Sequence, residues 1–258
     1  MAKIVGVGRV LATALLLALA SPGPGAAQGL LSGVDLTTPA FTKAELSRAD
    51  VEAMLARGDR NLSDKSLNGL DLSHLDLSGA NLREARVNHA NLRGAKLSGA
   101  TLDQAWLLKA DLSGADLSGA KLFGTQAIGA RFDGADLSRA RLAGDFTNAS
   151  FAGADFSGAD ASADMRNQSM GLMHAVMRSA DLSRAKAVKA DFSRVDLEFA
   201  NLSGADFSGA NLYRADASGA DLRGVALHGA NTAEMDIAGA RLDQEIRGAI
   251  HADRARRE

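Results

Sequence analysis

A period of five residues runs through most of this chain and constrains what it can fold into. An alanine recurs at every fifth position, as at Ala80 and Ala85, and a large apolar residue follows two places later, as at Leu82 and Val87. An α-helix repeats about every 3.6 residues and a β-strand alternates every two, so neither accounts for this period. The period predicts a backbone that turns a corner every five residues, with the alanine and the large residue facing inward.

The other three positions of each unit hold Asn, Asp, Arg, Lys, Ser and Gly, which suit tight turns and a hydrated surface. Units of the form A(D/N)LXX resemble those of the pentapeptide-repeat family, and they cover about residues 61–242. Clear examples begin at Ala80, Ala110, Ala115, Ala200 and Ala220. The resemblance implies an all-β solenoid, a right-handed quadrilateral β-helix with four pentapeptides per coil. Roughly nine coils would form a rod about 40 Å long, at about 4.8 Å per coil.

Leucines twenty residues apart would then form columns inside the rod, for example Leu72, Leu92 and Leu112. Each buried leucine contributes about 1.5–3 kcal/mol before entropy costs. Alanine at the small position lets opposite walls approach, because a larger residue there would overpack the core. This stacked core supplies the stability of a chain that contains no cysteine and hence no disulfide.

Residues 1–27 have the layout of a secretory signal peptide. A basic start precedes an apolar run over 10–20, and small residues follow, with cleavage expected after Ala20 or Ala27. The run is too short to span a bilayer, which takes roughly 20 residues. We therefore expect an exported protein, periplasmic or secreted, with no stable membrane span after cleavage. The alternative is an uncleaved apolar extension or anchor.

Segments of different character flank the repeats. They are a linker at 28–41, a capping helix at 42–59, the rod at 60–243, and a short C-terminal helix or basic tail at 244–258. The N-terminal helix is expected because Thr42 and Glu45 fit a capping box and apolar residues follow at helical spacing. Its expected role is to cover the open first coil, since solenoid ends need capping units.

The repeat loses its phase between about 143 and 170. Large residues fall one place early, as at Phe146, and the original phase has returned at Met177. A kink, bulge or short loop is expected here, either functional or a tolerated insertion. Met173 and His174 would face outward and are weak candidates for binding a soft metal such as copper(I). The alternative is that the methionines fill gaps in the core, and no cofactor is predicted.

Three large apolar residues occupy outward positions: Trp106, Leu108 and Phe123. Trp106 would stack between Arg86 and Gln126 of the adjacent coils. Exposed aromatic clusters mark interfaces, so one interpretation is a docking patch for another protein. The other is a local cation–π contact in which Arg86 lies over Trp106.

Aspartates also stack one per coil, at Asp196, Asp216 and Asp236. Asp116 and Asp136 are expected to continue the same line below the break. Like charges about 4.8 Å apart cost about 1 kcal/mol per neighbouring pair in bulk water. Such a ladder could bind cations or a basic protein partner, or neighbouring Lys and Arg side chains could screen it.

No catalytic constellation stands out, because the frequent serines recur at turn positions and the five histidines are scattered. The formal net charge of −2 argues against a nucleic-acid-binding surface and against acidic DNA mimicry. We therefore expect an exported, non-enzymatic binding or scaffolding protein whose partner is another protein. The resemblance implies an alternative, a cytoplasmic DNA mimic that binds type II topoisomerases. Soft-metal binding at the break is a second alternative, and the oligomeric state stays open.

Overall fold

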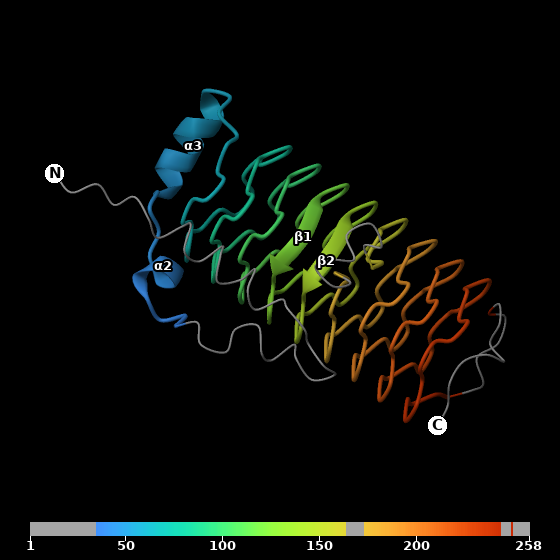
Figure 1. Cartoon of the computed structure of the whole chain (residues 1–258). Coiled ribbons are helices and arrows are strands. Elements are labelled where there is room, and N and C mark those ends of the chain that lie inside the picture. The colour runs from blue at the N-terminus through green and yellow to red at the C-terminus, as the bar shows by residue number, and fades with distance from the viewer. Residues whose placement is uncertain (1–34, 164–172, 244–248, 250–258) are drawn as a thin grey trace.

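A computed structural model describes residues 35–163, 173–243 and 249. These residues form an elongated rod of stacked coils, with two short helices at its N-terminal end (Figure 1). The elements are helices α2 (Pro39–Thr42) and α3 (Arg48–Ala56) and strands β1 (Lys121–Gln126) and β2 (Arg141–Asp145). Neither helix is long and apolar enough to cross a membrane. The expected signal peptide at 1–27 and nearly all of the expected C-terminal helix or tail at 244–258 lie outside the described residues.

Each regular coil contains four pentapeptides, because parallel bridges join residues twenty positions apart. Asn61 pairs with Asn81, for example, and Asn81 with Thr101. Only one residue of each regular unit forms such a bridge, since the next residues turn the corner, and most walls are therefore too short for a regular strand. The residue before each alanine closes the turn with a positive φ, 65° at Gly99 and 57° at His89, a conformation that glycine adopts most readily.

The core is a stack of the small and large inward positions. Leu72, Leu92 and Leu112 lie in one column and are at most 2% exposed. Near the break the core changes from leucine to phenylalanine, at Phe132, Phe146, Phe151, Phe156, Phe192 and Phe207. The rings of Phe132 and Phe151 stack with their centroids 4.8 Å apart. Aromatic pairs of this kind add about 0.5–1.5 kcal/mol to the burial energy.

The break in the repeat consists of a shortened unit followed by an insertion. The unit at 141–144 has four residues rather than five, and β2 pairs with β1 in parallel across a β-bulge. Among the described residues, the next bridging residue after Asp160 is Val176, and Asp145 pairs with Val176 rather than with a residue twenty positions on. The insertion therefore lies between Asp160 and Val176, and its residues 164–172 are outside the described ranges.

This break moves the aspartate columns. Asp136 pairs with Asp116 on one side and with Asp155 on the other, whereas the ladder of Asp196 leads back to Asp145. The expectation that Asp116 and Asp136 continue the line of Asp196 is therefore wrong. They lie two units away around the coil, on the opposite face of the rod, because the short unit and the insertion change the count of residues between the columns.

The helix at the N-terminal end is shorter than the expected 42–59. Ser47 is the N-cap of α3 and forms a capping box with Asp50, so this pair plays the role expected of Thr42 and Glu45. Glu45 instead donates its backbone N–H to the first coil at 2.8 Å, which keeps the chain extended. Val51 of α3 is fully buried within the core cluster, so the helix covers the first coil of the rod (Figure 1).

Candidate functional site

One wall of the rod brings together most of the residues predicted to bind a partner. We call it the Trp106 face, and its ladder consists of Ser66, Arg86, Trp106, Gln126, Asp145, Val176, Asp196, Asp216 and Asp236. Leu108 follows Trp106 by two positions on this wall. Phe123 lies on the neighbouring wall, where its N–H donates to Asp103 at 3.1 Å. The Trp106 face has an aromatic N-terminal half and an acidic C-terminal half.

Residues 35–46, which we call the N-terminal strap, lie along the aromatic half. Ser66 holds the strap twice: its carbonyl accepts the N–H of Glu45 at 2.8 Å, and its hydroxyl donates to the carbonyl of Lys43 at 2.5 Å. The side-chain amide of Asn68 donates to another strap carbonyl at 3.2 Å. The rod therefore binds the strap mainly through the strap's backbone.

Phe41 of α2 packs against Trp106, with ring centroids 5.0 Å apart and planes at 62°. Phe41 is 5% exposed and Leu108 is 8% exposed. The Nη2 of Arg86 lies 3.2 Å from the Oε1 of Glu45, so its charge is paired with the strap. Of the three residues predicted to form an open docking patch, Leu108 is thus buried and Trp106 is half-buried beneath Phe41, whereas Phe123 is half-buried on the neighbouring wall. Phe41 belongs to the segment 28–41, which was predicted to be a linker, and it is the only aromatic residue of that segment.

The acidic half carries carboxylates in two different settings. Asp196 is paired, since its Oδ2 lies 2.5 Å from the Nε of Arg178. Asp216 accepts hydrogen bonds from the N–H and the hydroxyl of Ser218, at 3.0 and 2.7 Å. Asp236 accepts one backbone N–H at 2.9 Å. Neither Asp216 nor Asp236 has an ion pair with a described residue, although the charge of Arg178 also acts on Asp216 from a greater distance.

Asp145 lies at the start of the acidic half and is 3% exposed. Its Oδ1 accepts the N–H of Thr147 at 2.9 Å, while its Oδ2 has no hydrogen-bond partner among the described residues. Burial raises the pKa of Asp145, against the hydrogen bonds from Thr147, and the charge of Asp196 raises it further. A carboxylate in this setting holds its proton more readily than an exposed one.

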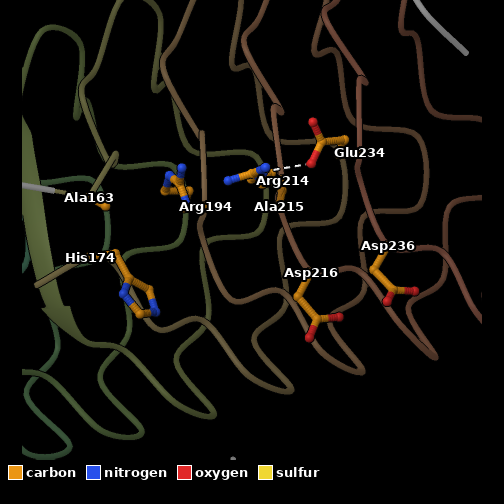
Figure 2. A pocket seen from close by; sticks show the side chains of 8 residues that line it. All are labelled: Ala163, His174, Arg194, Arg214, Ala215, Asp216, Glu234 and Asp236. Atoms are coloured by element: carbon orange, nitrogen blue, oxygen red, sulfur yellow. Dashed lines mark hydrogen bonds and ion pairs between the residues drawn. The ribbon is translucent and has the colours of Figure 1, made fainter. Parts of the chain in front are cut away.

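An open depression of about 420 Å³ adjoins the two unpaired carboxylates (Figure 2). It is lined by Ala163, His174, Arg194, Arg214, Ala215, Asp216, Glu234 and Asp236. The Nε of Arg214 lies 2.7 Å from Glu234, and the guanidinium groups of Arg194 and Arg214 lie 5.8 and 5.1 Å from the ring centroid of Tyr213. Figure 2 shows the arginines in one row along the rod and the aspartates in another, so the depression presents both signs of charge.

The two soft-metal candidates lie near this depression. Met173 and His174 are both partly exposed, and His174 lines the depression. Met177 is fully buried and fills the core. In the part of the chain that the structure describes, no group of three His, Cys, Asp or Glu side chains is placed to hold a metal ion.

Comparisons with known proteins place this rod in a family. A model described as pentapeptide repeats matches residues 61–99, 95–132, 122–163 and 190–229, in eight copies. A similar solved structure is HetL, a pentapeptide repeat protein involved in heterocyst differentiation regulation from the cyanobacterium Nostoc sp. strain PCC 7120. It is 28% identical over 82% of this chain and 95% of its own, with a TM-score of 0.56.

A second similar structure is trypsin-treated QnrB1, a plasmid-mediated fluoroquinolone resistance protein. It is 22% identical over 78% of this chain and 86% of its own, with a TM-score of 0.55, so the likeness is one of fold. No curated protein matches the chain. Because the family model covers more than half of the residues and the coils have its four-unit geometry, this chain belongs to the pentapeptide-repeat family.

Proposed function

We propose that the chain is an exported, non-catalytic protein that binds another protein through the acidic half of the Trp106 face. The observation that carries this proposal is the pair of Asp216 and Asp236. They are stacked one coil apart, without an ion pair to any described residue, and an open depression lies beside them. Like charges stacked one coil apart repel each other, and cationic side chains of a partner would relieve this repulsion. A partner segment with Lys or Arg is therefore the expected ligand.

The rest of the architecture supports a binding role. The inward positions are occupied almost entirely by alanine, leucine and phenylalanine, so the side chains that can bind a partner lie on the outer walls. Stacked repeats present a rigid, extended surface of the kind that solenoid proteins use for recognition. The formal net charge of −2 means that the chain as a whole is nearly neutral, which favours a defined contact over general attraction to cations.

Export is the part of the proposal that rests on the sequence alone. It is supported by the layout of residues 1–27 and is compatible with the lack of cysteine. Cell fractionation with N-terminal sequencing of the natural product tests it. We expect a chain that begins near Ser21 or Gln28 in an exported fraction. A full-length chain in the cytoplasm would contradict export and would favour the topoisomerase-binding alternative.

Paired substitutions on opposite faces test the binding surface. The double variant Asp216→Asn, Asp236→Asn removes both charges while keeping an oxygen that can accept the turn hydrogen bonds. The control is Asp116→Asn, Asp136→Asn, which changes two stacked aspartates of the same local geometry on the opposite face. Immobilised full chains are used to capture partners from the exported fraction, with quantification by mass spectrometry.

We expect a partner that binds the wild type and the control equally and is reduced about tenfold or more on the first variant, since two charge-assisted contacts are lost. Its capture should also weaken as salt is raised. Circular dichroism of the three proteins should be the same. Equal capture by both double variants would refute the acidic half as the binding surface.

A further inference from the structure

The strap lies on the aromatic half of the Trp106 face in the way that a bound peptide lies in a groove. We define the groove by Ser66, Asn68, Arg86, Asn88, Trp106 and Leu108. Two groove side chains donate to strap carbonyls, from Ser66 to Lys43 and from Asn68 to Ala40. Contacts to the backbone are independent of the side chains that the segment carries. They give affinity for a segment that follows the same backbone path, the helical turn of α2 followed by extended residues.

Two strap side chains add selectivity. Phe41 fits edge-on against Trp106 at 5.0 Å, and Glu45 pairs with Arg86 at 3.2 Å. The strap therefore presents to the groove an aromatic residue followed four positions later by an acidic one. An aromatic anchor beside a charged contact is a common arrangement in peptide recognition, because the anchor supplies most of the affinity.

The aromatic residue of the strap, Phe41, is separate from the core of the rod, whereas Leu46 at the end of the strap packs against the core. Phe41 does not belong to the core cluster, which runs from Val51 of α3 through the inward positions of the coils. Loss of Phe41 from the groove would therefore uncover Trp106 without opening the core of the rod. This distinguishes Phe41 from Val51 of α3, which is part of the core.

The strap also leaves polar groups of the groove unsatisfied. The Nδ2 of Asn88 and the Nε of Arg86 are buried and have no hydrogen-bond partner among the described residues. Asn88 is 1% exposed, and its Oδ1 already accepts the N–H of Leu108. A buried donor without a partner costs about 1–3 kcal/mol. A segment that places acceptors near both donors would fit the groove better than the strap does.

We propose that this groove is a peptide-binding site, occupied by the chain's own strap, for a partner segment that forms one helical turn and carries an aromatic residue in that turn, four positions before an acidic one. The inference rests on the proposed function in that the ligand is a protein, and it adds the kind of segment. The strap competes because its attachment gives it a local concentration of about millimolar. A partner segment therefore binds the groove tightly only when the strap is displaced.

The single tryptophan of the chain, Trp106, reports on the groove directly. The experiment uses the full chain and its Phe41→Ala variant, with a synthetic peptide of residues 35–46 as the probe. We expect the emission of the variant to shift to longer wavelength, because Trp106 gains water contact, and added peptide to reverse the shift. The apparent affinity for the peptide should be at least about tenfold higher in the variant than in the wild type, whose strap occupies the site.

Two controls distinguish binding in the groove from non-specific binding of the peptide. A peptide in which the phenylalanine is replaced by alanine should bind the variant about tenfold or more weakly, and adding Arg86→Ala to the variant should weaken binding of the unchanged peptide. If Phe41→Ala does not fold, Glu45→Ala serves as a second strap variant, because it removes the ion pair with Arg86 and so weakens the binding of the strap to the groove.

The proposal is overturned if strap variants that retain β-type circular dichroism bind no peptide up to millimolar concentration, or bind the alanine peptide equally well. Unchanged Trp106 emission in both strap variants would also overturn it. These outcomes leave the acidic half untouched, because its test changes only Asp216 and Asp236.

Discussion

Replacing Gly144 by alanine should destabilise the middle of the rod. Gly144 lies in β2 beside Thr125 of β1, and an added Cβ would stand 2.3 Å from the carbonyl oxygen of Thr125 and 2.9 Å from its nitrogen. Both atoms belong to the backbone, so no side-chain rotation can relieve the clash and the two strands must move apart. Overpacking of this kind costs about 1–3 kcal/mol, and we expect a loss of about 3 kcal/mol because the contact with the oxygen is so close.

Urea unfolding followed by circular dichroism measures this loss, and Trp106 fluorescence provides a second probe. The two probes should be compared, since long repeat arrays can unfold in parts. The matched control is Gly134→Ala, at a turn with φ 64° where an added Cβ meets no atom within 4 Å. That change should cost about 1 kcal/mol, from backbone strain alone.

The reasoning would be refuted by a Gly144→Ala variant within about 0.5 kcal/mol of the wild type, the usual range for a neutral surface change. It would be refuted equally by a Gly134→Ala variant that loses as much as Gly144→Ala. Either result would mean that the close approach of β1 and β2 at the shortened unit does not determine the stability of the break.

Two further predictions concern the interior. Leu112→Ala should lower the free energy of unfolding by about 2–5 kcal/mol, because Leu112 is fully buried in a column. Phe199→Ala, at a side chain 63% exposed, should change it by no more than about 0.5 kcal/mol. Equal losses in urea titrations would contradict the core assignment. Asp145→Asn should stabilise the rod at pH 7 by about 1 kcal/mol, because it removes a buried, incompletely hydrogen-bonded charge. The folded pKa of Asp145 lies above its unfolded value, so the native state binds more protons and this residue's contribution worsens as pH rises from about 4. The advantage of Asp145→Asn over the wild type should vanish below that pH, and a stability difference between the two proteins that does not change as pH rises from about 4 to 7 would contradict the raised pKa.

The interior of the rod could be predicted from the sequence because each inward position repeats the same chemistry. Leu72, Leu92 and Leu112 occupy the same position in three successive coils. Because every coil stacks on the next, the five-residue period alone predicts that they are buried. The alignment of columns on the two sides of the break could not be predicted by counting residues in the same way. The line from Asp136 to Asp196 crosses a four-residue unit and an insertion, and neither length can be read from the pattern alone.

The N-terminal end shows a limit of another kind. Thr42 with Glu45 and Ser47 with Asp50 are both plausible capping boxes by local sequence. The choice between them is tertiary, because the backbone N–H of Glu45 donates to the first coil and Ser47 is then free to cap α3. The contact of Phe41 with Trp106 likewise joins residues that are distant in the sequence, and the five-residue period does not predict it.

Photo-crosslinking in the producing cells tests most directly that the acidic half of the Trp106 face binds a protein. A crosslinking residue is introduced in place of Ser218, beside Asp216, and for comparison in place of Ser138, beside Asp136 on the opposite face. We predict a discrete crosslinked protein from position 218, found in an exported fraction and absent from position 138. Equal crosslinking from both positions, or a product from position 138 alone, would contradict the proposed function.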